Sequence, residues 1–182
     1  MLGWFGLDDE TKPGEADRTL ARLARDLSAA GLRVAGAIQI NIDQGADCAC
    51  DMEVLVIGEE DRPIRISQSL GGGSAGCRLD PGALEMAAAR VGARLAGAEL
   101  LIVPKFGRQE AVGRGFRAVI AQAVADGLPV LLHVPPEQRD AFAGFCDGMG
   151  ERVDPAELAG WCLARTTGES LAAVKEALQL GI

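Results

Sequence analysis

Two apolar runs, residues 100–103 and 128–134, constrain the fold of this chain most strongly. Neither shows the strict alternation of a half-buried strand, so both are typical of central strands that helices cover on both faces. Residues 15–30 instead place apolar side chains at every third or fourth position, which predicts an amphipathic helix. Residues 1–7 and 32–40 are strand candidates on either side of it. The order strand, helix, strand predicts a three-layer α/β fold with a mostly parallel sheet between helices.

Turn and capping signals place two further elements. Short apolar segments flank the charged turn at residues 58–62, so we expect an antiparallel β-hairpin inserted at about residues 52–67. Asp80 is a suitable N-cap for the following helix, with Pro81 at its first position. This helix is expected to run to about residue 96.

The length of the chain bounds its domain organisation. With 182 residues, 48% of them hydrophobic, the chain can bury one substantial core but is short for two. We therefore expect a single α/β domain over residues 1–182. Its C-terminal part, about residues 137–182, should be helical, with one start at Asp154 and a final amphipathic helix over residues 169–180.

Charge and composition exclude several classes of partner. A net charge of −8 argues against a general nucleic-acid or anionic-membrane binder, and with no Tyr and 4% aromatic residues the chain offers few rings for base stacking. The apolar runs are too short to span a bilayer, and residues 1–7 lack the features of a secretion signal. We expect a cytoplasmic protein with five reduced cysteines. The sequence does not decide whether the protein forms a homodimer or binds another protein.

A cysteine-bearing loop is the first candidate site. It carries Cys48, Cys50 and Asp51, and the fold could bring Cys77 close to them. Thiolates suit a thiophilic metal such as zinc or copper(I), and a Cys-x-Cys pair can chelate if a third ligand arrives from elsewhere. The alternative is ordinary thiols, because small buried cysteines are common in Ala-rich cores.

A glycine-rich loop is the second candidate. Its residues could direct backbone N–H groups and hydroxyls at an anion: Ser67, Gln68, Gly71, Gly72 and Gly73, with Arg78 at the exit. It is no Walker A loop, because the Gly-Lys-Ser/Thr ending is missing. The alternative is a flexible connector between a strand and a helix.

A cationic loop after the strand at residues 100–103 is the third and best-supported anion site. Its four cations lie in a short stretch of an otherwise acidic chain: Lys105, Arg108, Arg114 and Arg117. Ligand crevices of open parallel sheets lie beyond the carboxyl ends of the strands, and helix N-termini also favour anions. The alternative is a solvated charged turn balanced by Glu110. His133 is the single histidine and falls at the end of a predicted buried strand, so we expect a structural role for it and neither a Ser-His-Asp triad nor a His-rich metal site.

Five short motifs give the chain a family resemblance. They are Cys-Asp-Met at 50–52, Arg-Ile-Ser-Gln at 65–68, Gly-Cys-Arg-Leu-Asp at 76–80, Lys-Phe-Gly-Arg-Gln-Glu-Ala at 105–111 and Gly-Arg-Gly-Phe-Arg at 113–117. Together they resemble a bacterial domain-of-unknown-function family. Its members look like degenerate relatives of P-loop nucleoside triphosphatases and often occur near genes for molybdate transport and nitrogenase. The resemblance implies a P-loop-like fold and a link to molybdenum, and makes Cys50 and Cys77 better metal candidates than Cys48.

The same resemblance implies that the phosphate loop has been lost. Where a working enzyme has its phosphate loop, residues 6–18 offer Gly6, Lys12 and Gly14 but no Gly-Lys-Thr. Where such an enzyme has a magnesium-holding carboxylate, this chain has Lys105. Both departures argue against ATP hydrolysis and for direct binding of an anion.

Three functions follow as hypotheses. The leading one is a small-anion binding protein with little or no catalysis, which holds molybdate, another oxyanion or a phosphate-bearing molecule, with cysteine ligation of a thiophilic metal as a possible addition. The second is a nucleoside triphosphatase or nucleotide-dependent transferase with a nonstandard phosphate loop, in which Asp51 or Glu110 serves as a magnesium ligand or as a base. The third is a regulatory or assembly module that binds another protein.

Overall fold

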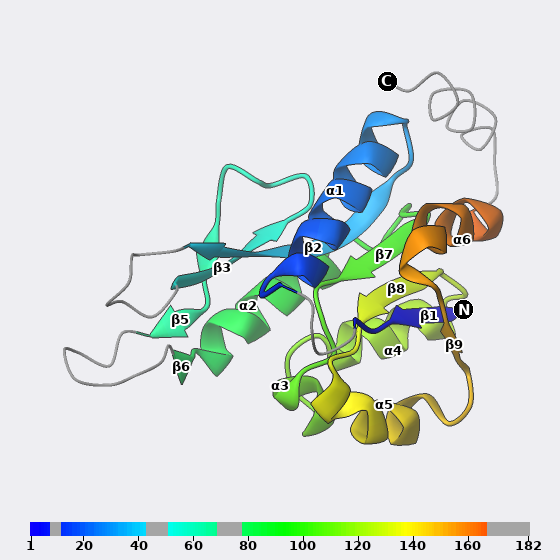
Figure 1. Cartoon of the computed structure of the whole chain (residues 1–182). Coiled ribbons are helices and arrows are strands. Elements are labelled where there is room, and N and C mark those ends of the chain that lie inside the picture. Colours follow the sequence, from blue (N-terminus) through cyan, green and yellow to red (C-terminus); the bar gives the residue numbers. More distant parts are fainter. Residues whose placement is uncertain (8–11, 43–50, 69–77, 167–182) are drawn as a thin grey trace.

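A seven-stranded mixed sheet forms the centre of the computed structural model, which describes residues 1–7, 12–42, 51–68 and 78–166 (Figure 1). The strand order is β4-β3-β2-β7-β8-β1-β9. The strands are β1 (Leu2–Phe5), β2 (Val34–Ile42), β3 (Asp51–Val56), β4 (Ile64–Arg65), β7 (Leu100–Val103), β8 (Val130–His133) and β9 (Gly150–Arg152). A separate two-stranded sheet pairs β5 (Ser67–Gln68) with β6 (Arg78–Leu79).

Five of these strands run parallel, which confirms the predicted fold class. β2, β7, β8, β1 and β9 pair parallel in that order, while β3 and β4 add antiparallel pairs beyond β2. The expected hairpin therefore exists, but its second strand is short. The Ile66 N–H donates to the Met52 carbonyl, and the Ile66 carbonyl then accepts from the Asp80 N–H. At Ile66 the chain thus leaves β3 and begins to pair with the segment around β6.

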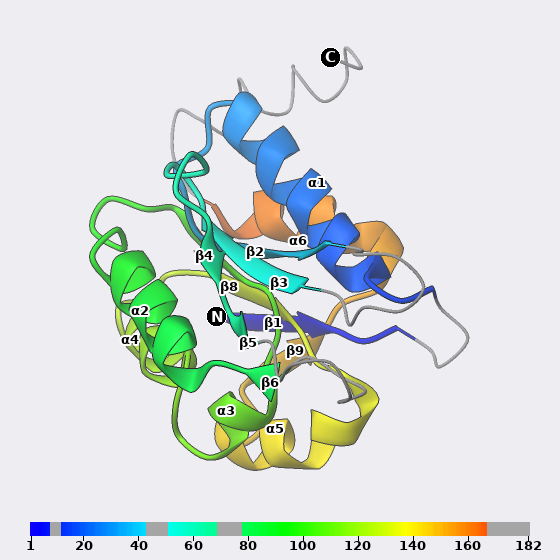
Figure 2. The same cartoon turned by 90° about the vertical axis from the view of Figure 1, so that its left-hand side faces the viewer.

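Helices cover both faces of the sheet (Figure 2). α1 (Glu15–Ala29) and α6 (Leu158–Arg165) pack on one face, and α2 (Pro81–Gly92), α4 (Arg117–Ala125) and α5 (Arg139–Cys146) pack on the other. Short helices η1 (Pro136–Gln138), η2 (Pro155–Glu157) and α3 (Arg108–Ala111) complete the described elements. In β7, Leu101 and Val103 belong to one core cluster while Leu100 and Ile102 belong to the other. This two-sided burial explains the unbroken apolar run.

Local signals set several boundaries as expected. The Asp80 side chain caps α2 by accepting from the N–H groups of Gly82 and Ala83 at 2.9 and 3.1 Å, with Pro81 at the first position. α2 ends at Gly92, four residues earlier than expected. Gly36 in β2 has φ 137°, and a Cβ there would collide with the Ile102 carbonyl, so only glycine lets β2 and β7 approach this closely.

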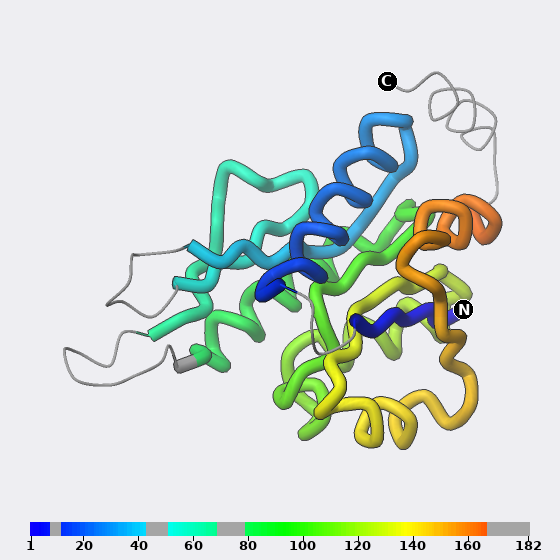
Figure 3. Tube along the Cα trace, in the orientation of Figure 1, coloured from blue at the N-terminus to red at the C-terminus, as the bar shows by residue number. Residues whose placement is uncertain are grey.

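The parallel strands all end on the same side of the sheet, which we call the carboxyl edge; the side on which they begin is the amino edge (Figure 3). Both names refer to the ends of the strands and not to the outermost strands of the sheet. β1, β2, β7 and β8 all end at the carboxyl edge. Among the described residues, no helix is long and apolar enough to cross a membrane. The expected helix at residues 169–180 lies outside the described residues, and a single domain over residues 1–182 stays a prediction.

Candidate functional site

The predicted metal loop falls largely outside the described residues. Cys48, Cys50 and Cys77 lie outside them, as do Gly71, Gly72 and Gly73 of the glycine-rich loop. Asp51 pairs with Arg65, and its Oδ1 accepts a hydrogen bond from the Ser67 hydroxyl at 3.2 Å. Within the described ranges, no group of three or more His, Cys, Asp or Glu residues could hold a metal ion. The metal ligation of the cysteines therefore stays a prediction.

The described ends of the glycine-rich loop are engaged in closing it. The Ser67 hydroxyl also accepts from the Met52 N–H at 3.1 Å, and Ser67 is buried. The Gln68 amide donates to Asp80 at 3.1 Å, and Gln68 pairs in register with Arg78 across β5 and β6. The Ser67 bonds tie the first end of the loop to β3, and the Gln68 bond and the β5–β6 pairing hold the two ends together at the carboxyl edge.

The four cations of the third loop do not gather at one point. Arg108 and Arg114 are exposed. The Arg117 guanidinium lies 4.4 Å from the centre of the Phe145 ring and donates to the Glu110 carbonyl at 3.1 Å, so it helps to hold the loop. Lys105 differs from the others, because it is half-buried directly after β7.

Glu110 is the internal brace of this loop and not its solvated counter-charge. Its side chain is buried, and its two carboxylate oxygens accept from the N–H groups of Gly107 at 2.8 Å and Phe116 at 3.0 Å. A carboxylate committed to two backbone donors fixes the course of residues 107–116. Glu110 thereby fixes the loop that begins two residues after Lys105.

Lys105 lies within electrostatic reach of groups on two other segments. Burial, together with the nearby charges of Lys105 and Arg139, lowers the pKa of His133, at the end of β8, to about 4, while Glu137 opposes this shift. Burial raises the pKa of Asp17, in the first turn of α1, and Lys105 counteracts this rise. α1, β7 and β8 thus bring their polar residues together at the carboxyl edge.

A chain of amide hydrogen bonds forms the wall beside Asp17. The Gln39 amide donates to the Asn41 side-chain oxygen at 2.8 Å, and the Asn41 amide donates to Asp17 at 2.7 Å. Gly14, with φ 74°, precedes α1 and takes a left-handed conformation that favours glycine. A hollow of about 480 Å³ lies here, lined by Pro13, Gly14, Asp17, Arg18, Ala21, Gln39, Ile40 and Asn41. A smaller cavity of about 60 Å³ shares Gln39 and adjoins Lys105.

Sequence reasoning selected Lys105 but missed its neighbours. A lone histidine such as His133 is more often structural, and no sequence motif indicates Asp17, Gln39 or Asn41. The signal that could have found His133 and Asn41 is the rule that selected Lys105, because they also lie at carboxyl ends of parallel strands. Asp17 could have been found as the first-turn acidic residue of the helix after β1.

Comparisons with known proteins give one family and one curated relative. Residues 9–161 match the model of a family described as "Protein of unknown function (DUF2478)". The chain is 40% identical over 139 residues to a protein of Bradyrhizobium diazoefficiens named molybdenum import ATP-binding protein ModC 2. That match covers 75% of this chain but spans 15% of the relative's own length. No solved structure matches the chain.

Proposed function

Because the chain belongs to the DUF2478 family of proteins of unknown function, and is similar to part of a protein named for molybdenum import, we propose that it binds a small oxyanion at Lys105. The ligand is molybdate or a phosphate-bearing molecule, and the protein is accessory to molybdenum metabolism. The ATP-binding name of the relative fits a P-loop-like fold. The proposal itself is for binding without hydrolysis.

The observation that carries the proposal is that the Lys105 ammonium is half-buried and unpaired within the described residues. Lys105 is half-buried and, among the described residues, forms no ion pair within 4 Å. A partly desolvated cation that has no ion-pair partner within 4 Å favours an anion from solution. The neighbouring His133, with its pKa lowered to about 4, is neutral near pH 7 and can donate one N–H hydrogen bond.

The experiment is a binding titration with and without the Lys105 charge. Isothermal titration with molybdate, tungstate, sulfate, phosphate and ATP should give heat with at least one of them. Lys105→Met should weaken that binding by about 10- to 100-fold, which is the value of one hydrogen bond to a charged group. Arg22→Gln is the matched control, because Arg22 is an exposed cation on α1. No heat with any of the anions would refute the proposal.

The single histidine provides a second readout of the same site. An untagged chain shows one set of imidazole signals by nuclear magnetic resonance, since His133 is its only histidine. An anion beside Lys105 offsets the cations that depress the pKa of His133, so the pKa should rise from about 4 when the anion binds. Binding with no change in the His133 titration would place the anion elsewhere.

A further inference from the structure

Arg139 reaches the carboxyl edge from a second direction. It is the first residue of α5 and follows β8 after the turn at residues 134–138. A Cβ atom built on Gly6, just after β1, would lie 2.9 Å from Arg139 Nη2 and 3.3 Å from the Val134 carbonyl oxygen. The guanidinium therefore lies against the backbone at the end of β1, in space that the missing side chain of Gly6 leaves open.

The donors of Arg139 are incompletely used. Its Nε is buried and has no hydrogen-bond partner, and Arg139 forms no ion pair within 4 Å among the described residues. Across those residues, one other buried side-chain atom lacks a partner, the Gln109 Oε1. Both atoms belong to segments that leave the carboxyl ends of β7 and β8. Buried polar groups in folded proteins are nearly always hydrogen-bonded, so an orphaned cationic donor requires an explanation.

We infer that Arg139 is a second anion-binding residue, and that the ligand lies between Arg139 and Lys105 beside His133, at the carboxyl end of β1. This inference rests on the proposed function and places its ligand. β1 and β8 are adjacent, and the helices that follow them, α1 and α5, cover opposite faces of the sheet. Open parallel sheets bind their ligands at such a switch in connection.

The chemistry of Arg139 specifies the class of ligand. A guanidinium offers N–H donors in a planar fork that matches two oxygens of one tetrahedral oxyanion. A second cation, Lys105, suits a dianion better than a monoanion. The ligand is therefore a tetrahedral dianion, which is either a free oxyanion or the phosphate group of a larger molecule. Asp17 and Glu137 are the carboxylates within electrostatic reach of this group of charges, so the site is not uniformly positive.

Two variants test Arg139 in different ways. Arg139→Gln removes the charge and should weaken binding of molybdate or inorganic phosphate by about tenfold or more. Gly6→Ala keeps the charge but places a methyl group against Arg139 Nη2, so the guanidinium must move and affinity should also fall. Arg139→Lys should recover part of the loss, since it restores the charge without the fork. Arg22→Gln is again the control.

The titrations separate this inference from the proposed function. If the wild type binds and both Arg139→Gln and Gly6→Ala bind as tightly as Arg22→Gln, the role of Arg139 is refuted and the Lys105 site stands. If the wild type binds none of the anions, both are refuted. Circular dichroism and thermal unfolding identify any variant that fails to fold, in which case the remaining two of Arg139→Gln, Arg139→Lys and Gly6→Ala decide. Comparison of phosphate with ATP distinguishes a free oxyanion from a phosphate group.

Discussion

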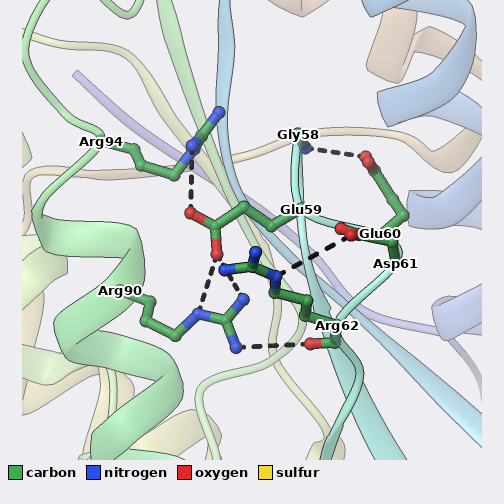
Figure 4. Close-up of polar contacts among 7 residues, drawn as sticks. All are labelled: Gly58, Glu59, Glu60, Asp61, Arg62, Arg90 and Arg94. Atoms are coloured by element: carbon green, nitrogen blue, oxygen red, sulfur yellow. Dashed lines mark hydrogen bonds and ion pairs between the residues drawn. The ribbon is translucent and has the colours of Figure 1, made fainter.

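The two edges of the sheet treat their charged side chains differently. At the amino edge, Glu59 in the turn between β3 and β4 pairs with both Arg90 and Arg94 of the α2 end, and Arg90 also donates to the Arg62 carbonyl at 3.3 Å (Figure 4). At the carboxyl edge, Lys105 and Arg139 have no such partner among the described residues. Paired charges hold segments of the protein together, whereas unpaired, half-buried cations can attract and bind an anionic ligand.

The size of a hollow would have selected the amino edge. A depression of about 700 Å³ lies there, larger than the 480 Å³ hollow beside Asp17. It is lined in part by Arg33, whose guanidinium pairs with Glu99 at 3.6 Å and donates to the Gly97 carbonyl at 2.6 Å. Its charged lining is thus internally neutralised. The comparison teaches that the two edges differ in the pairing of their charges, which the volumes of their hollows do not reveal.

The largest effect should come from removing the brace of the carboxyl edge. Glu110→Ala leaves the N–H groups of Gly107 and Phe116 without their acceptor inside the protein. We expect the free energy of unfolding to fall by about 2–4 kcal/mol, measured by urea denaturation. Because this loop begins two residues after Lys105, anion affinity should fall as well. Glu110→Gln retains one acceptor oxygen, so it should lie between the wild type and Glu110→Ala; equal stability of all three would contradict the brace.

A smaller effect should appear as a pH dependence that belongs to the carboxyl edge. The pKa of His133 is lowered from its ordinary 6.5 to about 4, so the unfolded chain binds more protons than the folded one between these values. The contribution of neutral His133 is therefore present above about pH 6.5 and is lost as the pH falls toward 4. Asp17, with its raised pKa, acts in the opposite sense.

Variant His133→Gln isolates this contribution. The free energy of unfolding should be measured for wild type and variant from pH 7 to pH 4. As the pH falls, the wild type should lose stability relative to the variant. A constant difference over this range would show that His133 does not titrate with a lowered pKa.

The smallest effect should come from the paired amino edge. Hydrogen bonding from Arg90 lowers the pKa of Glu59, but both side chains are partly exposed, so solvent and salt screen the pair. Glu59→Gln should reduce the melting temperature slightly in low salt and less in high salt. Its anion affinity should stay within about twofold of the wild type. If Glu59→Gln lost as much anion affinity as Lys105→Met, the proposed distinction between the two edges would be wrong.

Much of the fold could be predicted from local patterns. The apolar runs around β7 and β8, the helix at residues 15–30 and the Asp80 cap all depend on neighbours close in sequence, and all are confirmed. The order of the strands could not be predicted, because it depends on pairings such as Leu2 with Val130 that no local signal encodes. The early end of α2 and the short β4 likewise depend on tertiary contacts.

The candidate site was predictable in one of its segments. Four cations close in sequence drew attention to Lys105, yet Arg117 is used to hold the loop and Arg108 and Arg114 lie exposed. The neighbours Asp17, Asn41, His133 and Arg139 each come from a different segment. Their proximity follows from strand order and register, so it required the structure.

The position of β1 also constrains how the protein can be assembled during synthesis. β1 lies between β8 and β9, and its Leu2 is in register with Val130 and Gly150, so both of its partners are translated long after it. Closing such long loops is slow, and the nascent chain must carry an unpaired apolar strand until its C-terminal half leaves the ribosome. β2, β3 and β7 can associate earlier. The end of β1, where the anion is proposed to bind, is therefore among the last parts of the molecule to form.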